Sequence, residues 1–191
     1  DRMALEGNEF AAELDRFAAV CRIVAGMKDA RVGAIGARPA DFNTMRCSEK
    51  VLEAHGITVE PVDLSEIIGN AESLPEDEPQ VEEWLTTIKN YCDTGDTAEK
   101  HLERMARLGV AIDRFCREKE LDAYALQCWT SIEENFGVAP CTVMSMMSNA
   151  MRPAACEVDV GGALAMYALK LASETPSALL DWKNNYGGDE D

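Results

Sequence analysis

Short apolar runs and longer stretches of helical spacing alternate along this chain. The runs at 31–36, 57–64 and 121–129 predict strands, and two further short strands are expected at 156–160 and 177–182. Stretches with helical spacing lie between these runs. Because β-α-β units of this kind build parallel sheets, the pattern predicts an α/β fold with a layered, mostly parallel sheet and helices on both faces.

Apolar residues that recur every three or four positions predict the helices. One helix is expected over the first thirty residues, with one apolar face formed by Phe10, Leu14, Phe17, Cys21 and Val24. Further helices are expected at 48–55, 81–91, 141–150 and 162–173, together with a long helix that begins at Thr97. Residues 67–80 hold a glycine and two prolines among acidic residues, so a loop or short turn is expected there.

Charge and cysteine usage narrow the class of protein. The 191 residues carry 18 Lys and Arg against 35 Asp and Glu, a formal net charge of −17. This balance argues against nucleic-acid and anionic membrane partners, which both need basic patches. Seven cysteines without a CxxC pair are typical of small buried thiols in a reducing compartment. No apolar run approaches membrane-spanning length, and we expect a soluble, cytoplasmic protein.

Two acidic residues stand at the ends of consecutive strand-like runs in the last third of the chain. Glu157 ends the run AACE, and Asp181 ends the run ALLD. Because parallel strands end at the same edge of a sheet, the two carboxylates are expected to lie close together. Such a pair can hold a divalent ion or exchange protons. A strand-end acid also often caps the following helix, and Asp159 fits that second role better.

Three segments of the chain resemble the L-fucose isomerase/L-arabinose isomerase superfamily, especially its fucose-isomerase-like branch. They cover about half the chain in the right order and include the patterns CE-x-D and D-x-x-N-N, which flank an apolar helix. The segments are RVGAIGARPADFNTMRCSEKVLEAHGITVEPVDLSEI (31–67), DAYALQCWTSIEENFGVAPC (122–141) and ACEVDVGGALAMYALKLASETPSALLDWKNNYGGDED (155–191).

The resemblance implies an enzyme that interconverts an aldose and a ketose with a divalent cation, usually Mn²⁺. Glu157 matches the Glu of the family's CE motif, and Asp181 matches the Asp after the intervening helix. In the family these carboxylates are metal ligands and also move a proton between sugar C1 and C2, through an enediolate. Gln127 resembles the family's sugar-contacting glutamine, and Trp129 is a candidate for lining the same pocket, although an aromatic residue there is more often part of the core.

The chain departs from the family at the third metal ligand. That ligand is a histidine far downstream in the family, whereas His55 and His101 both precede Glu157. We therefore expect residues 1–176 to be the central α/β domain of a sugar isomerase and 177–191 to begin a truncated C-terminal domain. Such a fragment is expected to be inactive alone, and the full-length protein is expected to be a homo-oligomer.

Two other functions remain open at this level. A non-catalytic sugar-binding or regulatory α/β module would keep the same scaffold. A superfamily enzyme with altered chemistry, such as a lyase or epimerase, would use the same carboxylates through a related enediolate. No residue pattern in the sequence indicates which sugar is the substrate.

Overall fold

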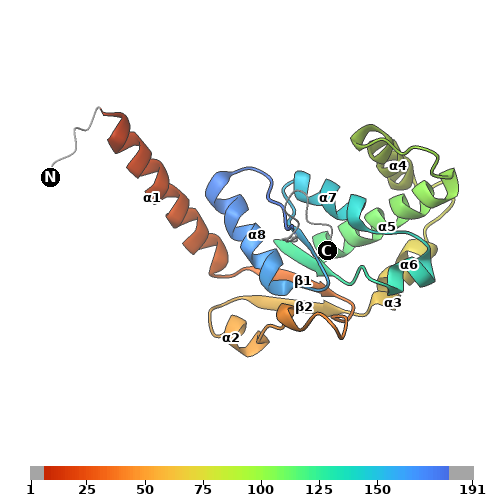
Figure 1. Ribbon diagram of the computed structural model, residues 1–191, viewed down its shortest axis with the longest axis horizontal. Coiled ribbons are helices and arrows are strands. Elements are labelled where there is room, and N and C mark those ends of the chain that lie inside the picture. Colours follow the sequence, from red (N-terminus) through yellow and green to blue (C-terminus); the bar gives the residue numbers. More distant parts are fainter. Residues whose placement is uncertain (1–6, 181–191) are drawn as a thin grey trace, which may run out of the picture.

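One parallel sheet organises the molecule. The computed structural model describes residues 7–180, and the strands found there follow the order β2-β1-β3-β4. All three strand pairs are parallel (Figure 1). The strands are β1 (Arg31–Ile35), β2 (Thr58–Val62), β3 (Ala123–Leu126) and β4 (Ala154–Cys156).

Helices connect and cover these strands. The two longest, α1 and α5, have 20 residues each. No helix within residues 7–180 is long and apolar enough to cross a bilayer. The helices are α1 (Asn8–Met27), α2 (Glu49–Glu53), α3 (Leu64–Glu72), α4 (Pro79–Tyr91), α5 (Glu99–Glu118), α6 (Ser131–Phe136), α7 (Cys141–Asn149) and α8 (Val160–Ser173), with a 3-10 turn η1 at Asn43–Met45.

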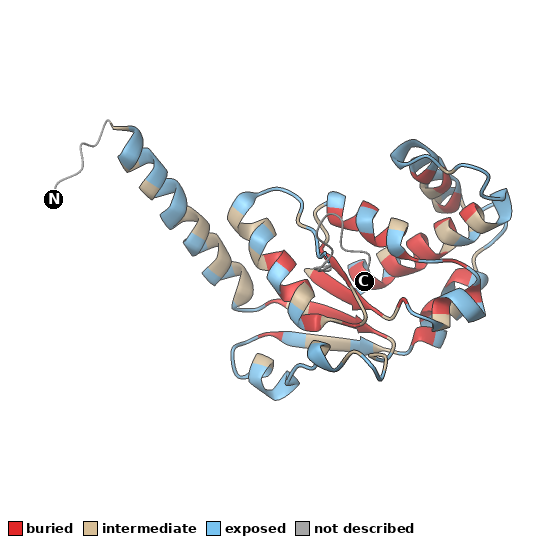
Figure 2. Ribbon diagram, in the orientation of Figure 1, coloured by how far each residue is buried: buried red, intermediate tan, exposed pale blue. Residues whose placement is uncertain are grey.

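Strands β1, β3 and β4 are buried on both faces of the sheet, which explains why they read as apolar runs, whereas the edge strand β2 has no buried residue. In β3, Tyr124 and Leu126 pack into the core cluster shared with α3, α5 and α7, whereas Ala123 and Ala125 pack into the cluster under α8. This alternation follows from the two-residue period of a strand. Figure 2 shows the buried strands between the buried sides of these helices. The expected layered α/β fold, with helices on both faces, is confirmed.

The strand order creates a crevice at one edge of the sheet. After β1 the chain moves outward to β2, then crosses back to β3 on the other side of β1. The carboxyl ends of β1 and β3 are therefore followed by segments that leave in opposite directions. Open α/β sheets bind ligands at such a switch point.

Two stretches differ from the sequence expectation near this edge. The loop expected at 67–80 begins instead with part of α3, because Ile67 and Ala71 are fully buried one turn apart. Their burial outweighs the cost of Gly69 inside the helix, about 1 kcal/mol. The short helix α6 was not anticipated either, since its six residues give too few turns for a periodic pattern.

The strand expected at 177–182 is wrong over residues 177–180, which form no strand. Ser177 instead donates a hydrogen bond to the carbonyl of Met166 in α8, at 2.8 Å. Leu179 then packs near Gly162, at the beginning of α8. The segment thus runs back along a helix rather than adding to the sheet.

Four cysteines are exposed, contrary to the expectation of buried thiols: Cys21, Cys47, Cys92 and Cys141. Cys116 and Cys128 are buried as expected, and burial raises the pKa of Cys116 to about 12. The apolar face of α1 is exposed as well, with Phe17 66% accessible. Apolar spacing had placed these residues on one face correctly, but spacing does not show whether anything packs against that face.

The core position Ile112 in α5 provides a test of this packing. Ile112→Ala is expected to lower the free energy of unfolding by about 2–5 kcal/mol, because it leaves a cavity among fully buried neighbours. Leu169→Ala is the matched control, since Leu169 is 56% exposed, and it should change stability by less than about 0.5 kcal/mol. Urea unfolding measures both variants. Equal losses would contradict the assignment of the core.

Candidate functional site

Three of the four residues singled out from the sequence lie at the carboxyl edge of the sheet. Gln127 directly follows β3, Trp129 lies two residues further on, and Glu157 directly follows β4. Since β3 and β4 are neighbours and Leu126 pairs with Cys156, Gln127 and Glu157 occupy equivalent positions on adjacent strands. The fourth residue, Asp181, lies outside the described residues.

Glu157 combines a strained backbone with an unpaired buried oxygen. Its φ is +59°, and that of Val158 is +54°, both in the left-handed region that costs most residues about 1–2 kcal/mol. The thiol of Cys128 donates to Glu157 Oε1 at 3.2 Å, whereas Oε2 is buried and has no hydrogen-bond partner among residues 7–180. Buried polar atoms are seldom left unpaired, because this costs free energy that a ligand can recover.

The helix-capping role belongs to Asp159 and not to Glu157. The Asp159 side chain accepts a hydrogen bond from the backbone N–H of Gly162 at 2.8 Å, at the start of α8. This is the pattern of an N-cap residue. Neither carboxylate oxygen of Glu157 caps the helix, since Oε1 accepts from a thiol and Oε2 has no partner in the described part of the chain. The alternative interpretation, that Glu157 caps the helix after its strand, is therefore wrong.

Gln127 is held at the switch point by the end of β1. Its backbone N–H donates to the carbonyl of Ile35 at 2.8 Å, and its Oε1 accepts from the N–H of Ala37 at 2.8 Å. Gly36 between them has φ +83°, and a Cβ there would lie 2.6 Å from Gln127 Oε1. The glycine thus permits both the turn and the close approach of the amide. With its oxygen occupied in this way, Gln127 is fixed in orientation beside the crevice.

Trp129 is not a core residue. Its side chain is 48% exposed and meets Phe42 edge to face, with ring centroids 5.8 Å apart. Together with Gln127 it lines a cavity of about 370 Å³. The structure therefore favours the interpretation of Trp129 as a residue that lines a pocket over its interpretation as a core residue.

A larger cavity opens on the other side of Gln127. It has a volume of about 830 Å³, enough for a monosaccharide, and lies between the ends of β1, β2 and β3. Its polar lining includes Asp63, Ser131 and Asn135, which sequence reasoning did not single out. Asp63 stood at the end of a predicted strand and could have been found by that signal, whereas Ser131 and Asn135 belong to the unanticipated α6.

Asp63 illustrates how this lining is organised. Its carboxylate accepts from the hydroxyl and the backbone N–H of Ser65, at 2.6 and 2.8 Å. These two hydrogen bonds, the hydroxyl first, lower the pKa of the Asp63 carboxyl. Asp63 is therefore an ionised hydrogen-bond acceptor at the rim of the cavity, and it also caps the start of α3.

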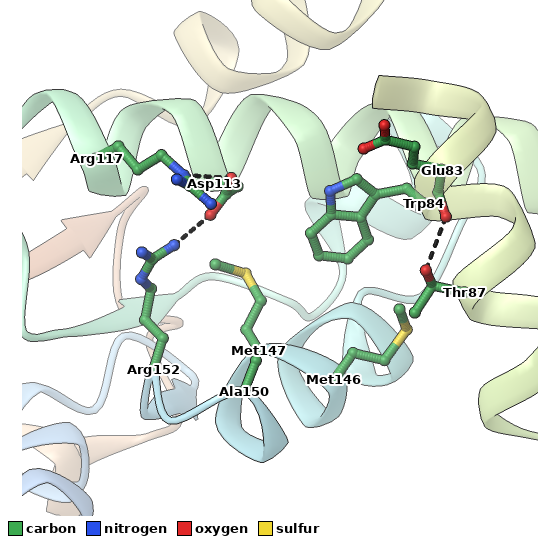
Figure 3. A pocket seen from close by; sticks show the side chains of 9 residues that line it. All are labelled: Glu83, Trp84, Thr87, Asp113, Arg117, Met146, Met147, Ala150 and Arg152. Carbon is green, nitrogen blue, oxygen red and sulfur yellow. Dashed lines mark hydrogen bonds and ion pairs between the residues drawn. The ribbon is translucent and has the colours of Figure 1, made fainter. Parts of the chain in front are cut away.

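A further cavity, of about 300 Å³, lies away from this edge, between α4, α5 and α7 (Figure 3). Trp84 lies between Met146 and a cluster in which Asp113 accepts from both Arg117 and Arg152. Arg152 precedes β4, so this cavity is on the amino side of the sheet. The guanidinium groups already share one carboxylate, which indicates a structural ion cluster.

A divalent cation fits the environment of Glu157 in part. The unpaired Oε2 is a hard oxygen ligand of the kind that Mn²⁺ and Mg²⁺ accept. Within residues 7–180, however, no group of three or more His, Cys, Asp or Glu side chains is arranged to hold a metal ion. His55 is exposed, and its Nδ1 lies 2.8 Å from the carbonyl of Val51. Glu157 can thus supply one oxygen ligand to a divalent cation.

Part of the chain is similar to curated sugar isomerases. No family model matches the chain. It is 27% identical to the sulfoquinovose isomerase of Priestia megaterium over 162 residues, 79% of this chain and 34% of that protein. It is 28% identical to the sulfoquinovose isomerase of Alkalicoccus urumqiensis over 169 residues, 85% of this chain and 37% of that protein. The chain spans about a third of the length of these curated relatives, and the similarity supports a sugar isomerase family without fixing its branch.

If Glu157 is kept for function at a cost in stability, glycine should relieve that cost. Glu157→Gly removes a carboxylate oxygen that is buried without a partner among residues 7–180, together with a side chain in the left-handed region, so it should leave stability unchanged or raise it by up to about 1 kcal/mol. Glu174→Gly is the matched control for the backbone term, since Glu174 is exposed and has φ +56°. Thermal and urea unfolding compare the two variants. A loss of more than about 1 kcal/mol in Glu157→Gly alone would show that the carboxylate serves the fold.

Proposed function

We propose that this chain is the central domain of a metal-dependent aldose–ketose isomerase that interconverts sugars. The observation that carries the proposal is the buried Oε2 of Glu157, which no other described residue hydrogen-bonds and which lies directly after a strand at the carboxyl edge of the sheet. The similarity to sulfoquinovose isomerases supports the same reaction class. In this assignment residues 1–176 form the central domain, and 177–191 lead into the next.

Glu157 is proposed as an acid/base group. Aldose–ketose interconversion needs one proton to move between C1 and C2, and a positioned carboxylate contributes about 10²–10⁴-fold to such a step. Cys128 holds Oε1 and leaves Oε2 free. The carboxylate therefore presents one oxygen in a fixed direction, which proton transfer between adjacent carbons requires.

Asp181 is proposed as the partner of Glu157. It directly follows Leu180 in the sequence, and the described chain at Leu179 has returned to the beginning of α8, close to Gly162. That helix begins three residues after Glu157. Glu157 and Asp181 would hold Mn²⁺ together with a histidine from outside this chain, and the cation would polarise the sugar oxygens next to the reacting carbons.

Gln127 and Trp129 are proposed to bind the sugar. The Gln127 amide is fixed by Ala37 and borders both cavities at the switch point. An exposed indole beside such an amide offers an apolar face to the ring of a sugar, while the amide hydrogen-bonds its hydroxyls. Sulfoquinovose is the first substrate to test, since the relatives are named for it. Assembly into a homo-oligomer stays a prediction.

Activity of the full-length natural protein that carries this sequence tests the proposal. With Mn²⁺ present, Glu157→Gln should lower kcat for sugar isomerisation by about 10²–10⁴-fold, because the amide cannot take up the proton. Glu174→Gln is the control, since Glu174 is an exposed residue at the end of α8. Sulfoquinovose, L-fucose and L-arabinose serve as substrates, and chromatography of the products measures turnover. Undiminished turnover by Glu157→Gln would reject the proposed role.

A second variant tests the role of Gln127. Gly36→Ala places a Cβ 2.6 Å from Gln127 Oε1 and should displace the amide, so KM is expected to rise more than kcat falls. Gly95→Ala is the control for backbone strain, because Gly95 also has a positive φ of +51°, nothing lies within 4 Å of the added Cβ, and Gly95 lines neither cavity. Steady-state kinetics on the same full-length protein measure both. If Gly36→Ala leaves KM unchanged while the protein stays folded, Gln127 does not bind the sugar.

The alternative is a sugar-binding module without catalysis. It is favoured by the fact that Glu157 lines neither of the two cavities that Gln127 borders. Such a module would bind sugar equally well with and without metal. Isothermal titration of sugar, in Mn²⁺ and in chelator, separates the two functions, because the isomerase requires weaker binding after the metal is removed.

A further inference from the structure

The loop between β1 and α2, residues 36–48, forms one wall of the smaller cavity at the carboxyl edge of the sheet. Pro39 and Asp41 line this cavity from the loop, and Trp129 lines it from the segment after β3. None of the residues 36–48 is buried, so burial contributes little to the shape of the loop. Hydrogen bonds within the loop must therefore set the position of this wall.

One guanidinium group closes the loop on itself. Nη1 of Arg38 donates to the carbonyls of Pro39 and Phe42, at 2.9 and 3.0 Å, and lies 3.5 Å from the carbonyl of Ala40. The backbone N–H of Phe42 donates to the carbonyl of Pro39 at 3.2 Å, so side chain and backbone close the same turn. Hydrogen bonds from a charged donor are stronger than neutral ones, which makes Arg38 the main constraint on this turn.

Arg38 acts on the loop rather than on a partner charge or a ligand. No ion pair among residues 7–180 includes it. It also lines neither of the two cavities at the carboxyl edge. A contribution of Arg38 to sugar binding must therefore pass through the residues that the loop positions.

The turn held by Arg38 places the ring of Phe42 against the indole of Trp129. The ring centroids are 5.8 Å apart and the ring planes meet at 87°, which is the edge-to-face arrangement that aromatic pairs favour. Because Trp129 is 48% exposed, it has little packing of its own, and contact with Phe42 orients its indole. The orientation of this cavity-lining ring thus depends on Phe42, and the position of Phe42 depends on Arg38.

We propose that Arg38 is a positioning residue for the sugar site, which acts through Phe42 on the indole of Trp129. An indole that is already oriented binds a sugar without the loss of side-chain freedom that ordering a mobile ring requires. The inference rests on the proposed sugar-binding role of Trp129 and adds to it a residue outside the cavity lining. Loss of Arg38 should weaken sugar binding and leave the proton transfer unchanged.

Steady-state kinetics of the full-length natural protein, with sulfoquinovose, L-fucose and L-arabinose, test the effect on binding. Arg38→Met removes the donors, so KM should rise about two- to tenfold with little change in kcat, the range that one oriented aromatic contact contributes. Arg38→Lys keeps a charged donor and should restore part of the loss. Arg46→Met is the matched control and should keep the native KM. It removes the same charge from the same loop, but Arg46 donates to the exposed side chain of Asn43 and lines neither cavity.

Near-ultraviolet circular dichroism tests the positioning itself, without sugar or metal. The difference between the spectra of the native protein and Trp129→Leu is the contribution of Trp129. The same difference, taken in an Arg38→Met background, should be weaker, because the indole loses its fixed contact with the ring of Phe42. Phe42→Leu keeps an apolar side chain but removes the ring, and it should weaken the Trp129 signal in the same way. Far-ultraviolet spectra confirm that each variant is folded.

A double-mutant cycle separates action through Trp129 from any other route. In a Trp129→Leu background, Arg38→Met should not raise KM further. An unchanged Trp129 signal or an unchanged KM in Arg38→Met would overturn the inference, and so would an equal rise of KM in Arg46→Met or a full further rise in the Trp129→Leu background. These results reject only the positioning role when the native protein turns over sugar. A native protein that isomerises none of the three sugars would reject the proposed function and this role together.

Discussion

The hydrogen-bonded register of the parallel strands is the constraint on which the site depends. It continues beyond the strands themselves: the N–H of Gln127 donates to Ile35 at 2.8 Å, and the N–H of Val158 donates to Leu126 at 3.3 Å. The residues that follow β1, β3 and β4 are therefore fixed relative to one another by backbone bonds. Side chains placed there need little further ordering before they meet a ligand, which is what preorganisation requires.

The turn after β4 shows how the core supports a strained position. Val158 and Val160, the first residue of α8, are buried in one core cluster, and the N–H of Asp159 donates to the carbonyl of Cys156 at 2.9 Å. Burial of the two valines and the Asp159 cap fix the turn, although Glu157 and Val158 both adopt left-handed conformations. The strain falls on the residue whose carboxylate has an unpaired oxygen. Such a combination is typical of a functional site.

The sequence could predict elements whose own pattern defines them. Apolar runs indicated β1, β2 and β3, whereas the strand expected at 156–160 lies instead at Ala154–Cys156 (β4), and Val160 already belongs to α8. Asp159 before two glycines indicated a helix cap, and the run AACE indicated the end of β4. Glu157 was placed at a strand end by the same run. The helix α3 was not predicted, because Gly69 and two prolines suggested a loop. The helix forms because Ile67 is buried against other elements.

Features that depend on contacts between distant segments could not be predicted from the sequence. The contact between the Cys128 thiol and Glu157 arises from the pairing of β3 with β4, which no local spacing encodes. The unpaired Oε2 of Glu157 likewise depends on what surrounds it in space. Asn135 lines the crevice from α6, and this helix is too short to show a periodic pattern in the sequence.

The central claim is that Glu157 supplies a metal ligand at the carboxyl edge. Titration of the full-length protein with Mn²⁺ tests this role of Glu157 without any sugar. Electron paramagnetic resonance of the free ion measures how much Mn²⁺ is bound. The account predicts that Glu157→Gln weakens Mn²⁺ binding by about tenfold or more, since an amide is a poorer ligand for a hard cation than a carboxylate. Glu174→Gln should bind as the native protein does. Equal Mn²⁺ affinity in the native protein and in Glu157→Gln would contradict the account.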